Sequence, residues 1–238
     1  NLRVIIPKKP RSEVVMHSHA MAYASLPTRR TLSSFHPWLY QAALWRQRGF
    51  RALKEKLSDK RFATHRVGAS LPFRITKHQS LLIRKLGDSD MTLQYNKVKN
   101  LKLASKEIDG VLIRPGETFS VWKLVGHPTK KKGYVDGLLL SHGEAKVGIG
   151  GGLCQIANLI YWMALHSPLV VTERYRHSFD AFPDSGRTIP FGTGATLFYN
   201  HIDLQLYNPT HQTIQLRIWV TDEHLKGELR SEDVVEHS

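Results

Sequence analysis

The sequence predicts an α+β protein with a mostly antiparallel sheet, packed helices and a basic helical extension at its N-terminus. Three observations support this fold class. Apolar residues recur at helical spacing in several segments, short alternating or apolar runs separated by Gly, Pro and Asn dominate after residue 110, and Lys and Arg gather before residue 92. The 238 residues are 41% hydrophobic and 23% charged, a composition typical of folded domains.

Changes in pattern divide the chain into four regions. Residues 1–34 contain Pro but no sustained period, and we expect them to form a loose basic arm. Residues 35–91 are expected to be a basic amphipathic helical region, and residues 92–225 an α+β domain. Residues 226–238 are expected to be a frayed acidic tail.

The first predicted helix begins at Pro37, because Pro suits the first helical turn. Basic side chains take its other faces, and its apolar stripe consists of Trp38, Ala42, Trp45, Phe50, Leu53 and Leu57. Such a helix could lie on an anionic membrane. The favoured interpretation is packing of this stripe on the body of the protein, because Gly49 weakens a freestanding helix by about 1 kcal/mol.

The predicted domain starts with a helix over 95–108, which Gly110 ends. Short strands are predicted beyond it at 111–113, 119–124, 169–171, 196–199, 202–206 and 214–220. In the last of these, Ile214 and every second residue after it form an apolar face. A further helix is predicted over 153–164, directly after a run of glycines.

The positive charge is concentrated in the first part of the chain. Residues 1–91 hold 18 Lys and Arg against 5 Asp and Glu, whereas residues 92–238 hold 16 against 15. This asymmetry indicates a basic surface facing a polyanion, either anionic lipid, nucleic acid or an acidic wall polymer. A solvated basic region without a ligand is an equal alternative at this stage.

Several classes of protein are excluded or disfavoured. One Cys allows no internal disulfide and no Cys-rich zinc module, and the His residues show no metal-ligand spacing, so we expect no metal or other cofactor. No apolar run approaches the length of a spanning helix, and residues 1–31 contain no secretory signal. We therefore expect a cytoplasmic protein, with binding to an anionic membrane surface through the basic N-terminal region as an open alternative. We expect no specific nucleic acid as a partner.

The most informative motif is the glycine-rich run that ends at Cys154. Four glycines between positions 148 and 152 demand an unusual backbone, and the helical period that follows places Cys154 in a first turn. Unpaired N–H groups there favour an anion, which predicts a lowered thiol pKa. A phosphate cradle is disfavoured because no Gly-Lys-Ser/Thr follows. A structural turn with a buried Cys154 remains the alternative.

A nucleophilic cysteine also needs a base, and His177 and His142 are the candidates. His177 follows Cys154 by 23 residues, enough for a helix and a returning strand that bring it back to the start of the helix. Arg174 and Arg176 could bind a carboxylate, and Asp180 could orient the imidazole.

Five motifs together resemble the VanW family. They are Arg114-Pro115-Gly116-Glu117-Thr118-Phe119-Ser120, Gly133-Tyr134, Gly150-Gly151-Gly152-Leu153-Cys154-Gln155, Glu173-Arg174 to His177, and Asp203-Leu204 leading to Asn208. The resemblance covers about residues 92–210. The preceding Trp- and Arg-rich helix is similar to the N-terminal part of the short, stand-alone members associated with B-type vancomycin resistance.

This resemblance implies a link to peptidoglycan and to glycopeptide resistance, including L,D-transpeptidase-like acyl transfer with Cys154 as nucleophile. It implies a peptidoglycan peptide or its precursor as partner, and Gly150, Gly151, Gly152, Gln155, Arg174, Arg176 and Glu117 are the candidate substrate-binding residues. Members commonly carry Gly-x-Asp-Ala-Thr before the late strands, where this chain has Gly194 at the Asp position.

Three functions from different classes follow from these observations. The first is a Cys154-dependent acyl transferase or hydrolase of wall peptides, with His177 as base. The second is a non-catalytic binding or accessory module for a wall precursor or a resistance partner. The third is a basic peripheral protein on a membrane or nucleic acid.

Overall fold

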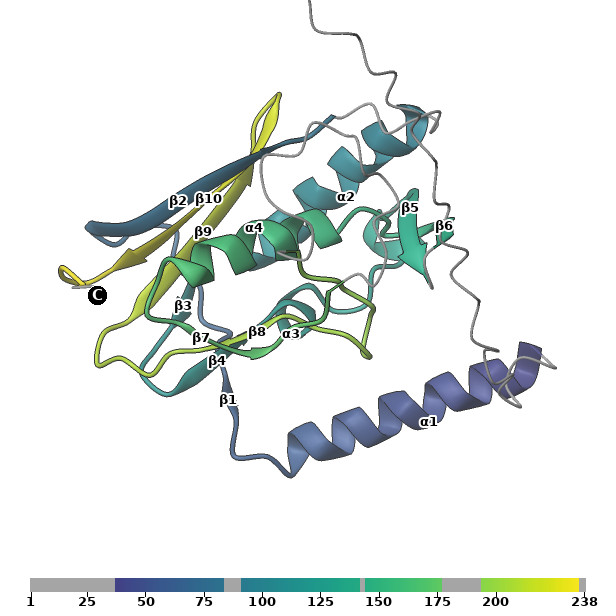
Figure 1. The fold of residues 1–238 in the computed structure, drawn as a ribbon, viewed down its shortest axis with the longest axis horizontal. Helices are drawn as coiled ribbons and strands as arrows, with labels where there is room; N and C mark the ends of the chain where they lie inside the picture. The colour runs from purple at the N-terminus through teal and green to yellow at the C-terminus, as the bar shows by residue number, and fades with distance from the viewer. Residues whose placement is uncertain (1–36, 84–90, 142–143, 177–193, 236–238) are drawn as a thin grey trace, which may run out of the picture. The chain divides into compact units, whose positions relative to one another are not determined.

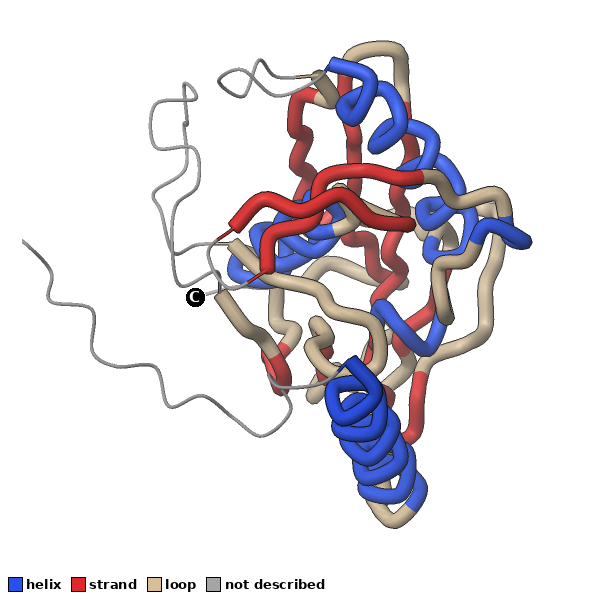
Figure 2. Tube along the Cα trace, turned by 90° about the vertical axis from the view of Figure 1, so that its right-hand side faces the viewer, coloured by secondary structure: helices blue, strands red, loops and turns tan. Residues whose placement is uncertain are grey.

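The computed structural model describes residues 37–83, 91–141, 144–176 and 194–235. Its internal contacts divide the chain into two units, Asn1–Ala43 and Leu44–Ser238. The second unit contains helices together with mostly antiparallel sheets, so the α+β prediction is confirmed (Figure 1). Figure 2 gives a second view of the same elements, with helices and strands distinguished by colour.

The larger antiparallel sheet has the strand order β2-β10-β9-β3. Its strands are β2 (Phe73–Leu81), β10 (His224–Ser231), β9 (Ile214–Val220) and β3 (Val111–Ile113). The predicted strands 111–113 and 214–220 are confirmed at their predicted bounds. All three strand pairs in this sheet are antiparallel.

Two strands of this sheet lie where none was predicted. β2 falls within the region predicted to be helical. β10 occupies the start of the predicted tail, so the prediction that the chain is frayed is wrong for residues 226–231. Residues along β10 alternate between buried and half-buried, with Leu225 and Leu229 fully buried. Two of the four buried positions are Gly227 and Ser231, so the apolar alternation that would indicate a strand is weak in the sequence.

A second sheet has the order β1-β4-β8-β7. Its strands are β1 (Arg61–Phe62), β4 (Glu117–Ser120), β8 (Gln205–Tyr207) and β7 (Val170–Glu173). β1 pairs with β4 in parallel, and the other two pairs are antiparallel. A separate hairpin joins β5 (Asp136–Ser141) to β6 (Glu144–Ile149), and this hairpin leads into the glycine turn.

Two helices cover the larger sheet (Figure 1). α2 (Met91–Ile108) packs on β9 and on the β5 strand, and α4 (Cys154–Leu165) packs on β2 and β10. The closest approach of α4 is at Gly227 in β10, where an added Cβ would lie 2.8 Å from Met163 Cε and 2.9 Å from Leu159 Cδ2. The helices predicted from the apolar period are therefore confirmed, with α2 starting four residues earlier than predicted.

A short helix replaces part of a predicted strand after Ser120. The alternation of Phe119, Val121 and Leu124 predicted an extended strand, but residues Val121–Val125 form α3. The Ser120 hydroxyl caps this helix by accepting a hydrogen bond from the Lys123 backbone N–H. A 3-10 helix follows at Lys130–Lys132. The predicted strand at 196–199 is absent from the described structure, which has only a Phe198–Ile202 bridge there.

The first predicted helix is confirmed as α1 (Pro37–Lys56), but its packing face is the reverse of the predicted one. Phe50, Leu53 and Leu57 belong to the apolar stripe, and all three are exposed. The face that contacts the domain is polar and carries Arg51 and Glu55. None of the described helices has the length and apolar character needed to cross a membrane.

Candidate functional site

The glycine turn links the β5–β6 hairpin to α4 through backbone hydrogen bonds. Gly150 N–H donates to the Val135 carbonyl at 3.0 Å, and Gly151 N–H donates to the Gly148 carbonyl at 3.1 Å. Gly150 and Gly152 have φ angles of +77° and +91°, a region that favours glycine. The run of glycines therefore produces the unusual backbone expected from the sequence.

A buried asparagine on α2 holds this turn in place, and no motif in the sequence predicted it. The Asn100 Nδ2 atom donates to the carbonyls of Val135 and Gly151, both at 3.0 Å, and its Oδ1 accepts from Val135 N–H at 2.9 Å. The side chain is fully buried and all three contacts are to backbone. Asn100 is thus a positioning residue for the turn that precedes Cys154.

The glycines allow close approach of other parts of the same chain. A Cβ at Gly151 would lie 2.1 Å from the Gly137 carbonyl carbon, and a Cβ at Gly152 would lie 2.2 Å from the Lys97 side chain. Gly150 packs in the same way against Pro128. Each of the three candidate substrate-binding glycines therefore has a packing role within the domain.

Cys154 is the first residue of α4, as the sequence predicted. Its Sγ accepts a hydrogen bond from the Leu197 backbone N–H at 3.4 Å. The predicted direction of its pKa shift is nevertheless wrong, because burial of the thiol raises the pKa above its ordinary value despite the hydrogen bonds from Leu197 and from its own backbone. The residue as a whole is half-buried.

Asn158 on α4, like Cys154, binds the backbone of the segment that starts at Gly194. Asn158, one turn after Cys154, is exposed, and its Oδ1 accepts from Ala195 N–H at 2.6 Å. A Cβ at Gly194 would lie 3.0 Å from this Asn158 Oδ1. The position that carries Asp in the resembled motif therefore lies beside α4, one turn from the thiol.

The two candidate carboxylate-binding arginines differ in their surroundings. The Arg174 guanidinium lies 4.5 Å from the centre of the Tyr161 ring, and it donates to the Gly194 carbonyl from both Nε and Nη2. Arg176 is exposed. Arg174 thus helps to hold the 194 segment against α4, whereas Arg176 faces solvent.

The remaining predicted site residues fall in three places. Gln155 Nε2 donates to Ser80 Oγ and to the Leu81 carbonyl, which ties the start of α4 to the end of β2. The carboxylate of Glu117 accepts from Arg114 N–H within its own turn. His177, together with the alternative base His142 and Asp180, lies outside the described residues. Among the described residues, no group of three His, Cys, Asp or Glu side chains is arranged to hold a metal ion.

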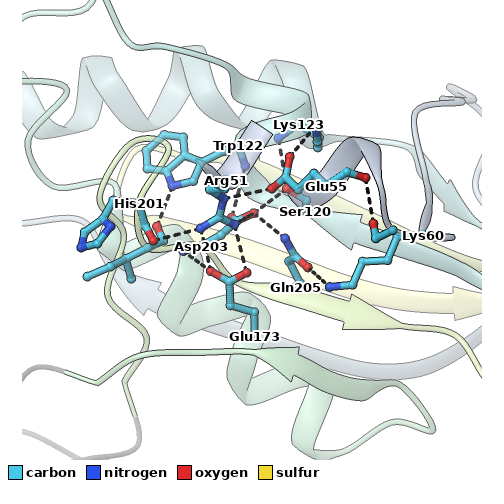
Figure 3. A network of polar contacts seen from close by, with 12 residues as sticks. Arg51, Glu55, Lys60, Ser120, Trp122, Lys123, Glu173, His201, Asp203 and Gln205 are labelled. Carbon is cyan, nitrogen blue, oxygen red and sulfur yellow. Dashed lines mark hydrogen bonds and ion pairs between the residues drawn. The ribbon is translucent and has the colours of Figure 1, made fainter. Parts of the chain in front are cut away.

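A second polar cluster, shown in Figure 3, is centred on the buried carboxylate of Asp203. Asp203 Oδ2 accepts from the Ser120 hydroxyl at 2.5 Å, and its Oδ1 accepts from the Leu204 N–H at 2.9 Å. Arg51 Nη2 lies 3.6 Å from Oδ2. Burial and the neighbouring Glu173 carboxylate outweigh these contacts and raise the Asp203 pKa to about 6.

Arg51 joins this carboxylate to Glu173 at the end of β7. Its Nη1 and Nη2 atoms donate to the two carboxylate oxygens of Glu173, each at 2.9 Å, and Nη1 also donates to the His201 carbonyl. Glu55, bound to Arg51 Nε and to Lys123 Nζ, completes the cluster. Burial raises the Glu55 pKa, but the hydrogen bonds from Lys123 and Arg51 prevail and lower it.

Three of the motifs noted in the sequence converge on this cluster. Ser120 ends the first motif, Glu173 opens the fourth, and Asp203 opens the fifth. The cluster fixes the end of β7, and Arg174 follows directly with its contact to Tyr161 on α4. The carboxylate cluster is therefore connected to α4, the helix that begins with Cys154, through Glu173, Arg174 and Tyr161.

The fold and site define an α+β domain in which a glycine turn presents its single cysteine at the start of a helix. A family model described as VanW like protein matches residues 96–230. The chain belongs to the VanW family.

Two curated relatives are similar to this chain. One is the vancomycin B-type resistance protein VanW of Enterococcus faecalis, which is 39% identical over 67% of this chain and 58% of its own length. The other is the uncharacterized protein YoaR of Bacillus subtilis, 31% identical over 50% of this chain and 37% of its own length. The alignments span about half of these relatives or less, and no solved structure matches the chain.

Proposed function

We propose that this chain acts on peptidoglycan peptides or their precursors as a cysteine-dependent acyl transferase connected with glycopeptide resistance. Support for the biological setting comes from the resistance relative, which shares 39% identity with the chain. Support for the chemistry comes chiefly from the position of Cys154, which starts α4 immediately after the glycine turn. The residue as a whole is half-buried, but its thiol is buried, so the peptide must displace the covering groups to reach the sulfur.

In the proposed reaction, the Cys154 sulfur attacks the carbonyl carbon of a peptide bond while its proton passes to a base. Collapse of the intermediate breaks the C–N bond, the departing amine takes a proton, and a thioester remains. An acceptor amine then attacks the thioester, loses a proton and releases the thiol. The N–H groups of Gln155 and Ile156 already donate to the Gly152 and Leu153 carbonyls, so a donor that steadies the developing oxyanion must come from the backbone before Gln155.

The raised pKa of the thiol makes the base essential to this proposal. A buried thiol is protonated at neutral pH, so its proton must leave as the carbon–sulfur bond forms. His177 is the proposed base. Arg176, exposed close to the end of β7, is the proposed docking group for a carboxylate of the peptide.

The second candidate is a non-catalytic module that binds a wall precursor or a resistance partner. The observation that favours it is the same burial of Cys154, which raises the pKa and disfavours the thiolate. The packing of Gly151 against Gly137 and of Gly152 against Lys97 also fits a structural turn. In this function Cys154 would be a small packing residue.

Cys154→Ala tests the two candidates against each other. Purified full-length protein is incubated with peptidoglycan stem peptides and an acceptor amine, and both turnover and peptide binding are measured. If the chain is an acyl transferase, the wild type turns over the peptide and Cys154→Ala does not. Ser167→Ala, which changes a residue just past the other end of α4, is the control and should retain turnover. Peptide binding without turnover, equal in wild type and Cys154→Ala, supports the module and removes the enzyme. Equal turnover in both removes Cys154 as nucleophile.

A further inference from the structure

Helix α1 has two opposite faces with different roles. Arg48, Arg51 and Glu55 recur at helical spacing on one face, where Arg51 and Glu55 bind the domain. Phe50 and Leu53 lie on the other side, where they are 67% and 53% exposed. The salt bridges to the domain thus hold α1 with an apolar face directed to solvent.

This outward face extends beyond those two residues. Leu57, just past the end of the helix, is 77% exposed, and Trp45 is 69% exposed. We define the outward face as Trp45, Arg46, Phe50, Leu53 and Leu57. Arg46 lies one turn before Phe50 on this face and is itself exposed. Contiguous exposed apolar side chains on one helix are unusual for a surface that only meets water.

The charges around this face indicate the chemistry of its partner. Between residues 37 and 57 the chain has one acidic residue, Glu55, and this side chain is engaged by Lys123 and Arg51 on the inner face. Exposed cations accompany the outward face at Arg46 and Lys56. Residues 1–91 as a whole carry 18 Lys and Arg against 5 Asp and Glu. The complementary surface must therefore be both apolar and anionic.

We propose that the outward face of α1 binds the surface of an anionic lipid bilayer, with the helix lying in the plane of the interface. Trp45, Phe50 and Leu53 enter the boundary between headgroups and acyl chains, and the Arg46 stem reaches back so that its charge meets lipid phosphate. This inference goes beyond the proposed function, because lipid binding by α1 requires neither the Cys154 thiol nor a wall peptide.

The ion pairs of Arg51 give this docking a consequence for the domain. The guanidinium joins α1 to Glu173 at the end of β7, and Arg174 next to it contacts Tyr161 on α4. A bilayer bound to the outward face would therefore hold the α+β domain at the membrane through the ion pairs of Arg51.

Co-sedimentation of the full chain with lipid vesicles tests the proposal. One set of vesicles contains phosphatidylcholine alone, and the other contains phosphatidylcholine mixed with phosphatidylglycerol. We expect binding to the anionic vesicles, weaker binding to the neutral ones, and a loss of binding as NaCl is raised. The double variant Phe50→Ser with Leu53→Ser should bind anionic vesicles about tenfold more weakly, because it removes two exposed apolar side chains that the bilayer would bury.

A matched control changes two exposed apolar residues elsewhere. Tyr95→Ser with Leu165→Ser alters α2 and α4 at side chains that are 62% and 49% exposed, and it should leave vesicle binding unchanged. Circular dichroism and thermal melting of both variants establish that they are folded.

Three results would overturn the proposal. The first is no binding to anionic vesicles, and the second is binding that Phe50→Ser with Leu53→Ser leaves unchanged, which would indicate adsorption by charge alone. The third is self-association of the wild type that this double variant abolishes while vesicle binding is absent. That result would assign the outward face to a second copy of the chain.

Discussion

The guanidinium of Arg51 and the carboxylate of Glu173 form a two-point ion pair between residues 122 positions apart, with both N–O distances at 2.9 Å. The pair connects the last part of α1 to the end of β7. Both side chains are mostly buried, so the pair experiences less screening than a surface pair.

Arg51→Ala should lower the free energy of unfolding by about 2 kcal/mol, because it leaves the Glu173 and Asp203 carboxylates without their cation. Urea unfolding followed by circular dichroism measures this loss. Arg66→Ala is the control, since its pair with Glu107 is exposed and spans 3.5 Å, and the change there should stay within about 0.5 kcal/mol. Equal losses of unfolding free energy in the two variants would show that the Arg51 ion pair stabilises the protein no more than an exposed pair.

Deprotonation of Asp203 should lower the free energy of unfolding as pH rises from about 4 to about 6. Its folded-state pKa is about 6, above the unfolded-state value of about 4, so the folded protein binds more protons across that window. Stability attributable to this carboxyl is greatest below the window and is lost through it. Asp203→Asn should flatten this part of the profile of unfolding free energy against pH. A wild-type profile that the substitution leaves unchanged contradicts a raised Asp203 pKa.

Gly151→Ala should destabilise the domain by about 3 kcal/mol, because the new Cβ would overlap the Gly137 backbone and neither backbone segment can move freely. Gly49→Ala provides the comparison. Gly49 lies in the exposed part of α1 with no heavy atom within 4 Å of the added Cβ, so this change should leave stability unchanged or raise it by up to about 1 kcal/mol. Thermal and urea unfolding of both variants measure the difference, and a neutral Gly151→Ala would refute the close approach.

The rate of Cys154 alkylation by iodoacetamide should keep increasing with pH beyond about 8.5, the ordinary thiol value, because burial raises its pKa. Cys154 is the one cysteine of the chain, so the bulk reaction reports on this site. Protein unfolded in urea is the control and should show the ordinary inflection. A plateau well below 8.5 in the folded protein would instead indicate a stabilised thiolate.

Local sequence patterns predicted much of the fold. The apolar face of β9, the helical period of α4 and the stop at Gly110 are local features, and all three agree with the structure. β10 was missed because two of its four buried residues are Gly227 and Ser231, which leaves too few apolar side chains to show the alternation of a strand. The outward face of α1 was assigned to the interior because periodicity identifies an apolar stripe but not what covers it.

The candidate site was predictable only in part, for a similar reason. A glycine run that precedes a helix is visible in sequence, and it placed Cys154 at the start of α4. The direction of its pKa shift depends on burial and on Leu197, 43 residues away, which no local pattern reveals. The Asp203 cluster needs Arg51, Glu55 and Lys123, which belong to none of the five motifs, whereas Ser120, Glu173 and Asp203 lie within them.

Intact-protein mass spectrometry after incubation with a peptidoglycan stem peptide tests the central claim most directly. If Cys154 is the nucleophile, the quenched wild type carries the mass of the acyl group as a thioester that hydroxylamine removes, and Cys154→Ala carries none. Turnover of the peptide with no adduct on the wild type and at an equal rate in Cys154→Ala would contradict the claim.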